Sequence, residues 1–123
     1  VDNVIRNHYL HPENYFEREL FALLEERGFD FRGCNLAGER TISYDANDGK
    51  TRKILGEWVP AFCFPFMRWA LRNHGGICPL KIDWFATRGA RCENPLVVHD
   101  LREGRSVPLS DHDAIGVDIL VAD

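Results

Sequence analysis

Apolar residues spaced as on one face of a helix occur over Asn14–Arg27. Four of them recur at i, i+4, i+7 and i+8 and would form one stripe: Phe16, Leu20, Leu23 and Leu24. Pro12 and Glu13 suit a first helical turn, and Gly28 suits the position just past a helix end. The pattern predicts an amphipathic helix over 14–27.

Alternating apolar and polar residues predict strands farther along the chain. Leu80–Thr87 is the clearest, because Ile82, Trp84 and Ala86 would share one side of it and Asp83 would lie on the other. Shorter strands are expected at Thr41–Tyr44, Thr51–Leu55, Pro95–Val98 and Gly116–Val121, with a turn at 45–50. A short helix is expected at Met67–Asn73, ended by Gly75-Gly76.

Length and composition change this picture only modestly. A chain of 123 residues with 45% hydrophobic content has room for one domain, so we treat 1–123 as a single unit. The net charge of −4 argues against a nucleic-acid binder that works by charge alone. No apolar run reaches the length of a membrane span, so no transmembrane segment is expected.

The N-terminus and the cysteines bear on compartment. The first ten residues include Arg6 and His8 and do not resemble a secretory signal, which favours a cytoplasmic location. The chain begins with Val1 instead of Met, so we expect that it is cut from a longer protein. The four cysteines are irregularly spaced without a C-x-x-C pair, which favours free thiols over a zinc site.

Two sequence features could carry chemistry. Ser110-Asp111-His112-Asp113-Ala114 directly precedes the last predicted strand, and Asp83 lies within the clearest one. A carboxylate is costly to bury alone, and one that accepts a hydrogen bond from an imidazole orients it as a base. We therefore expect Asp83 to pair with His112. The alternatives are an ordinary polar turn at 110–114, a solvated Asp83, and an unrelated α+β domain in which the two residues lie far apart.

Together these segments resemble the endonuclease/exonuclease/phosphatase superfamily, which includes pancreatic deoxyribonuclease and sphingomyelinases. Leu80–Gly89 is similar to its apolar strand with an I-D-Y/W motif, and 110–114 to its terminal S-D-H motif, with Ala114 where Pro is more usual. Gly28-Phe29-Asp30, which follows the predicted helix, is also similar to a G-F-D turn that follows a helix in this superfamily. The resemblance implies an α+β fold with one mixed, mostly antiparallel sheet and helices on one face, as in the C-terminal half of a four-layer α/β/β/α sandwich.

The resemblance also implies roles for individual residues. His112 would be the catalytic histidine, Asp83 the carboxylate that orients it, and Asp111 a ligand of a divalent metal, Mg²⁺ or Mn²⁺. The reaction would be metal-dependent hydrolysis of a phosphodiester or phosphomonoester. Arg88, which follows the predicted strand, is a candidate substrate-binding residue, with a solvated arginine as the alternative.

The family's N-terminal half, with its metal-binding Glu and D-x-N motif, has no counterpart in the sequence. We therefore expect a C-terminal fragment that is inactive alone and that dimerises through the sheet face left uncovered. A non-catalytic binding or assembly module is the alternative. The aromatic stretch Trp58–Trp69 is interpreted as core, with a substrate-stacking or lipid-touching loop as the alternative.

Overall fold

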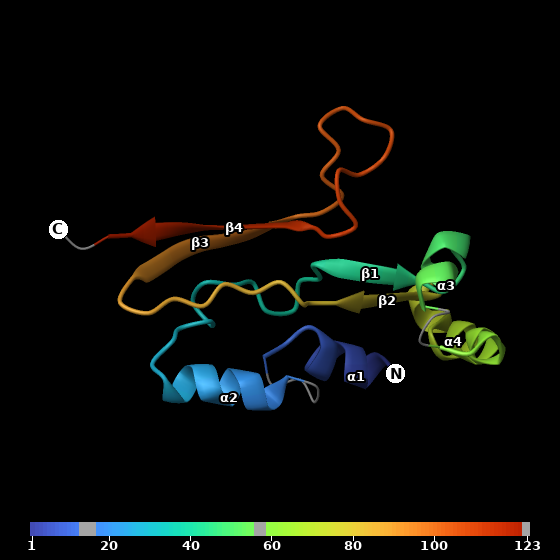
Figure 1. Ribbon diagram of the computed structural model, residues 1–123, viewed down its shortest axis with the longest axis horizontal. Helices are drawn as coiled ribbons and strands as arrows, with labels where there is room; N and C mark the ends of the chain where they lie inside the picture. Colours follow the sequence, from blue (N-terminus) through green and yellow to red (C-terminus); the bar gives the residue numbers. More distant parts are fainter. Residues whose placement is uncertain (13–16, 56–58, 122–123) are drawn as a thin grey trace.

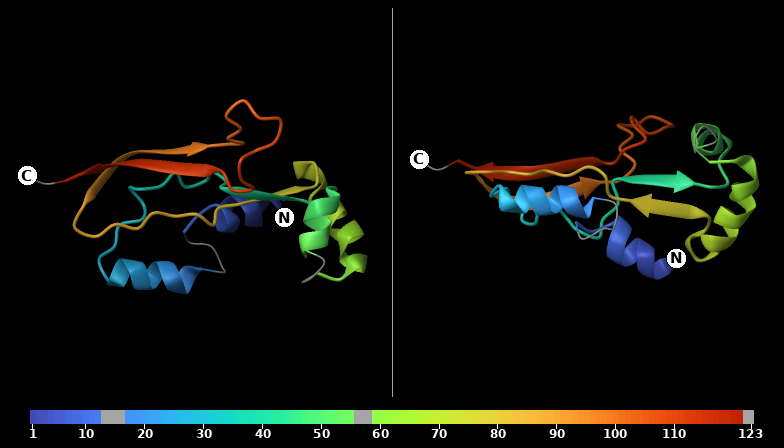
Figure 2. Two further views of the ribbon diagram at one scale, coloured as in Figure 1. Left: turned by 45° about the horizontal axis from the view of Figure 1, so that its top comes forward. Right: turned by 60° about the horizontal axis from the view of Figure 1, so that its bottom comes forward.

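The computed structural model describes residues 1–12, 17–55 and 59–121. They form a small α+β domain that contains two two-stranded antiparallel sheets. The helices are α1 (Asp2–Val4), α2 (Arg18–Glu26), α3 (Gly49–Leu55) and α4 (Phe64–Ala70). The strands are β1 (Ile42–Asp45), β2 (Ile77–Leu80), β3 (Arg91–Val98) and β4 (Ala114–Leu120). The helices α1 and α2 lie on one side of the strands, and α3 and α4 lie at one end (Figures 1 and 2).

The β1–β2 sheet carries the small apolar core. Its register runs from Ile42 opposite Leu80 to Asp45 opposite Ile77. Beyond β1, three buried side chains pack together from distant parts of the chain: Ile5, Ala46 and Leu71. Ile5 begins a π-helical turn over Ile5–Tyr9, so this core joins the N-terminal segment to the sheet and to the end of α4.

The predicted strand at Leu80–Thr87 is wrong over most of its length, because regular pairing ends at Leu80. In a strand, successive N–H groups point to opposite edges. Here the N–H groups of Ile82 and Asp83 both donate to the Thr41 hydroxyl, at 3.0 and 3.1 Å. Pairing resumes only at Thr87, which forms an isolated bridge with Asp30. A side chain thus takes the donors that a ladder would have used.

The second sheet is a long hairpin of β3 and β4, joined by the loop that rises from the sheet in Figure 1. Its register shifts between Glu93 and Leu96, around Pro95 and the positive-φ residue Asn94. An isolated bridge between Ile42 and His112 links it to β1. The expected single mixed sheet is therefore replaced by two separate antiparallel pairs, while the α+β class is confirmed.

Helix α2 begins within the predicted range and ends before Gly28, whose φ of 76° suits a helix stop. The predicted apolar stripe is only partly correct. Leu20 and Leu23 are 52% and 47% exposed, whereas Phe21 is buried. The Phe21 ring lies 4.9 Å from the rings of both Phe31 and Trp84, which explains why this residue faces inward. Phe16 lies outside the described residues.

The predicted strand Thr51–Leu55 is wrong, because these residues belong to helix α3. Asp48 starts this helix: its carboxylate accepts hydrogen bonds from the N–H and the hydroxyl of Thr51, both at 3.1 Å. The N–H of Thr51 also lowers the pKa of Asp48. Helix α4 begins at Phe64, ahead of the predicted start, because Pro65 fits a first helical turn.

The helices of the described residues are all too short or too polar to cross a membrane. Trp58, the first residue of the aromatic stretch, lies outside the described residues. Within the rest of that stretch, Phe64 is buried as expected for core packing, but Phe62, Phe66 and Trp69 are exposed. Interpretation of the whole stretch as core is therefore wrong for these three.

Candidate functional site

His112 and Asp83 meet at the junction of the two sheets. Asp83 lies three residues after β2, and His112 lies two residues before β4. The imidazole Nδ1 is 2.9 Å from one carboxylate oxygen of Asp83 and 3.1 Å from the other. The expected pairing of these residues, which are 29 positions apart, is therefore present in the structure.

The chemistry of the two groups decides which imidazole nitrogen carries the proton. An ionised carboxylate can only accept, so Nδ1 donates and the neutral ring has its lone pair on Nε2. The side chains are 39% exposed for His112 and 32% for Asp83, so solvent and small molecules can reach the pair. This arrangement can accept a proton at Nε2 and return it, as in general acid–base catalysis.

Thr41 holds the two site segments together. It is fully buried, and its hydroxyl accepts the N–H groups of Ile82 and Asp83. Its carbonyl oxygen accepts the N–H of Asp113 at 2.6 Å, and its own N–H donates to Leu80 at 2.9 Å. Thr41 thus binds the backbone on both sides of the site. From the sequence, Thr41 is expected only as part of a strand. A pattern of local spacing cannot indicate hydrogen bonds to residues so far away in the chain.

Asn35 provides a second tether to the segment that carries Asp83. Its amide donates to the carbonyl oxygens of Phe31 and Phe85, at 2.6 and 2.8 Å. Its side-chain oxygen accepts the Phe85 N–H at 2.9 Å. Asn35 is 8% exposed, so these bonds are shielded from water. Together with the Asp30–Thr87 bridge, they position the segment without a ladder.

Ser110 shapes the turn before His112. Its hydroxyl accepts the N–H of His112 at 3.0 Å and lies 3.4 Å from a carboxylate oxygen of Asp111, to which it donates. Asp111 is exposed. The polar-turn alternative therefore describes Ser110 correctly, and the same turn presents the His112 ring to Asp83.

Asp111 and Arg88 are not joined to the pair. Within the part of the chain that the structure describes, neither makes a hydrogen bond or ion pair with His112 or Asp83. Arg88 lies exposed in the bend after Thr87. The described residues also contain no group of three or more His, Cys, Asp or Glu side chains that could hold a metal ion. Asp111 alone supplies one oxygen ligand, so these residues do not fit a divalent metal by themselves.

A second histidine–aspartate pair, which sequence analysis missed, lies beside the first. His99 Nδ1 is 2.8 Å from Asp113, and its Nε2 is 3.0 Å from Glu39. These hydrogen bonds, first to Asp113 and then to Glu39, raise the pKa of His99 above 6.5. Both ring nitrogens face carboxylates, which favours the imidazolium and leaves no free lone pair. This pair suits structure better than catalysis.

Lys81 is a buried cation close to the site. Its side chain is almost inaccessible, and its Nζ has no hydrogen-bond partner among the described residues. It lies 4.8 Å from the centroid of the Trp84 ring, in cation–π contact. Burial lowers the pKa of Lys81, and the nearby charges of Asp83 and Glu39 oppose this shift.

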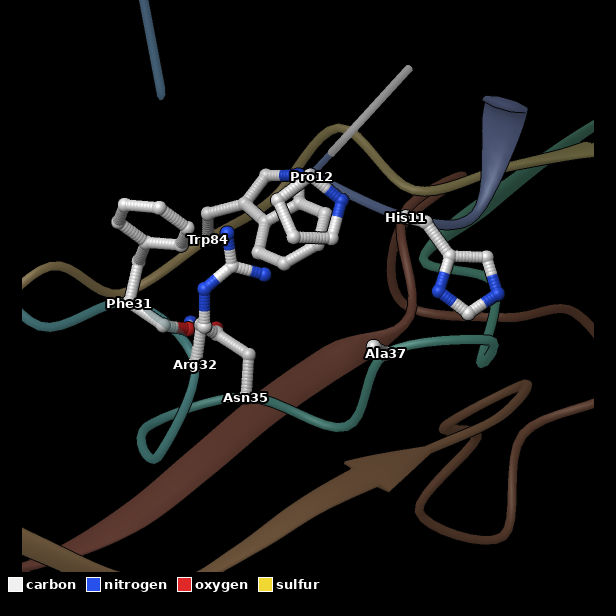
Figure 3. Close-up of a pocket in the computed structure, with 7 residues that line it drawn as sticks. All are labelled: His11, Pro12, Phe31, Arg32, Asn35, Ala37 and Trp84. Carbon is white, nitrogen blue, oxygen red and sulfur yellow. The ribbon is translucent and has the colours of Figure 1, made fainter. Parts of the chain in front are cut away.

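A pocket of about 270 Å³ lies beside the same segment, lined in part by Trp84, Phe31 and Arg32 (Figure 3). The Arg32 guanidinium lies 5.1 Å from the centroid of the Phe31 ring. His112 and Asp83 do not line this pocket. The pocket is therefore separate from the pair.

All four cysteines are free thiols in the structure. Burial raises the pKa of Cys78 to about 11, so this thiol stays protonated at neutral pH.

Comparison with known protein families, curated proteins and solved structures finds no match. Function is therefore argued from the site alone.

Proposed function

We propose that this chain carries the histidine–aspartate part of the active site of a phosphoric-ester hydrolase. The observation that supports it is the 2.9 Å contact between His112 Nδ1 and Asp83. The pair has the order and sequence context that resemble the endonuclease/exonuclease/phosphatase superfamily. His112 would move a proton at Nε2 while water attacks phosphorus, and Asp83 would orient the ring and stabilise its charged form.

The rest of such a site would come from outside the described residues. These residues do not fit a metal, so we derive no step through Mg²⁺ or Mn²⁺. In this proposal the chain corresponds to the second half of a four-layer sandwich, which agrees with the exposed apolar side chains of the β3–β4 hairpin.

The test is hydrolysis of bis-p-nitrophenyl phosphate and p-nitrophenyl phosphate by the longest natural protein that contains this chain, with and without Mg²⁺. We expect His112→Ala to lower kcat by about 10²- to 10⁴-fold, the usual contribution of a positioned acid–base group. Asp83→Asn should lower it by a smaller factor. His99→Gln is the matched control, since that ring is already held between two carboxylates.

Equal rates for the parent protein and His112→Ala would contradict the proposal. Residues 1–123 alone should show little or no turnover. If residues 1–123 alone show robust Mg²⁺-dependent turnover that is lost in His112→Ala, the half-site prediction is wrong. The proposed hydrolase activity would then stand.

A non-catalytic assembly module is the second candidate. It is favoured by Leu96, Val98 and Leu120, which share one face of the hairpin and are 49%, 39% and 44% exposed. Leu96 and Val98 adjoin on this face, and Glu93 and Asp118 separate them from Leu120. Exposed apolar side chains of this kind commonly mark an interface. Absence of ester hydrolysis in the long protein, together with self-association through this face, would establish the module instead.

A further inference from the structure

Positive charge is concentrated at the α3–α4 end of the molecule, which we define as residues 49–55 and 59–72. Residues 49–72 hold five Lys or Arg and one acidic residue, a net charge of +4. The other positions hold ten Lys or Arg and eighteen acidic residues, a net charge of −8. The five cations are all exposed: Lys50, Arg52, Lys53, Arg68 and Arg72. An acidic protein therefore presents one basic end.

Three aromatic side chains project from the same end. Phe62, Phe66 and Trp69 are 80%, 67% and 59% exposed. Phe66 and Trp69 are three residues apart in α4 and share one helical face, and Phe62 lies in the 3₁₀ turn Ala61–Cys63 that leads into this helix. The opposite face of α4 contributes the buried Phe64. The helix is thus apolar outward as well as inward, which is unusual for a helix that faces only water.

Two of the cations contact aromatic rings at this end. Arg72 lies 4.6 Å from the centroid of the Trp69 ring and donates to the Trp69 carbonyl oxygen at 2.8 Å. Arg52 of α3 lies 5.2 Å from the centroid of the Phe64 ring, so the basic helix packs against the aromatic one. Both helices lie at the end of the molecule away from the C-terminus (Figures 1 and 2).

An apolar groove of about 360 Å³ continues from this surface. It lies beside the exposed Phe66 and is also lined by Met67 and Ala70 of α4 and by Val1 and Val4. The surface therefore combines exposed rings, exposed cations and an adjoining apolar groove.

We propose that the α3–α4 end binds the surface of membranes that contain anionic lipids. Aromatic side chains occupy the headgroup region, and Lys and Arg on the same element contact the anionic headgroups. The groove beside Phe66 accepts part of an acyl chain. The contact is peripheral, since no described helix can span a bilayer. This inference does not rest on the hydrolase activity.

A single-stranded nucleic acid is the other polyanion that aromatic and basic residues recognise, usually in a groove with free stacking faces. Here the rings of Phe66 and Trp69 contact each other, with centroids 5.6 Å apart, and the Arg72 guanidinium lies over the Trp69 ring. The rings also project outward from a helix instead of lining a channel. The geometry favours a lipid surface.

The test is sedimentation of the protein with vesicles of phosphatidylcholine alone or with about a third phosphatidylserine. We expect binding to the mixed vesicles to exceed binding to neutral ones at least about tenfold, given the contribution of each basic residue near an anionic surface. Phe62→Ala/Phe66→Ala/Trp69→Ala and, separately, Lys50→Glu/Lys53→Glu/Arg68→Glu should each lose about tenfold or more.

The matched control is Leu20→Ala/Leu23→Ala, which removes exposed apolar side chains from α2 and should bind as the parent does. Should the triple variants misfold by circular dichroism, Trp69→Phe in a Trp58→Phe background serves instead. Brominated lipids should quench the tryptophan emission of Trp58→Phe and much less that of Trp58→Phe/Trp69→Phe, in which only Trp84 remains. Equal binding to neutral and mixed vesicles, unchanged binding of the triple variants, or binding to oligonucleotides without binding to vesicles would each overturn the proposal.

Discussion

At the scale of single residues, Thr41 decides how the site is built. One buried side chain binds the backbone beside Asp83, while the carbonyl of the same residue binds the backbone beside His112. The hydroxyl compensates for two N–H groups that would otherwise be left without a partner. A change at position 41 therefore acts on both site residues although Thr41 touches neither imidazole nor carboxylate.

We predict that Thr41→Val lowers the free energy of unfolding by about 2 kcal/mol, because it removes the shared acceptor of two part-buried N–H groups. Thr41→Ser keeps the hydroxyl and should cost about 1 kcal/mol for the lost methyl group. Urea unfolding of both variants measures the difference. Equal losses for Val and Ser would show that the hydroxyl bonds contribute little.

His99 gives the fold a dependence on pH. Because Asp113 and Glu39 raise the pKa of His99 in the folded state, the stabilisation is fully present below the unfolded pKa of about 6.5. This stabilisation is lost as pH rises through the higher pKa that His99 has in the folded state. We predict that the unfolding free energy of the parent falls over this window by under about 1 kcal/mol, since the ring is partly exposed.

His99→Gln isolates this effect, because every other ionisable residue is the same in both proteins. The difference in unfolding free energy between parent and His99→Gln should be largest at acid pH and shrink above neutrality. A difference that stays constant between pH 5.5 and 8.5 would contradict the assignment of the effect to His99.

At the scale of elements, the pattern of apolar and polar residues predicted the helix ends and strand limits that depend on neighbouring residues. Gly28 ends α2, and the hydrophobic residues of β1 and β4 form strands near their expected limits. The errors arise where a side chain overrides the pattern. Asp48 converts a predicted strand into helix α3, and the Thr41 hydroxyl interrupts the predicted strand after Leu80. The bonds of the Thr41 hydroxyl join residues 41 positions apart and cannot be identified by periodicity. The Asp48–Thr51 cap is local, but it is a helix-start signal that a periodicity of apolar residues does not contain.

The pairing of His112 with Asp83 could be predicted because a strand-borne aspartate needs a partner and a histidine in a polar turn can supply one. The tethers formed by Thr41 and Asn35 could not be predicted, because Thr and Asn are common in strands and turns for other reasons. The His99–Asp113 pair was also missed, since its members are separated by a loop whose course the sequence does not indicate.

The turn between α4 and β2 offers an element-scale test. Gly75 and Gly76 both have positive φ, at 65° and 81°. A Cβ on Gly75 would meet open space, whereas one on Gly76 would overlap the Asn47 side chain. We predict a loss of about 1 kcal/mol for Gly75→Ala from backbone strain alone and a larger loss for Gly76→Ala. Thermal unfolding compares the two, and equal losses would show that Asn47 simply moves aside.

At the scale of the whole molecule, the β3–β4 hairpin has apolar residues on both faces. Val97, Ile115 and Val117 are half-buried on one face, and Leu96, Val98 and Leu120 are exposed on the other. We predict that residues 1–123 self-associate through the exposed face. Light scattering should show a mass that rises with concentration, and Leu96→Asp/Leu120→Asp should restore the monomer.

The control for self-association is Leu20→Asp/Leu23→Asp, which changes equally exposed leucines on α2. It should associate as the parent does. A parent chain that stays monomeric at high concentration would contradict self-association. Association abolished by the α2 control alone would place the interface elsewhere.

The side-chain tethers of the Lys81–Thr87 segment have a kinetic consequence. In a ladder, neighbouring pairs protect one another, and an amide exchanges with solvent only when several bonds open together. The amides of Ile82 and Asp83 instead depend on one hydroxyl, and that of Phe85 depends on one amide oxygen. Loss of the hydrogen bonds of a single side chain releases them. The backbone beside Asp83 can therefore open on its own, faster than the sheet to which it is attached.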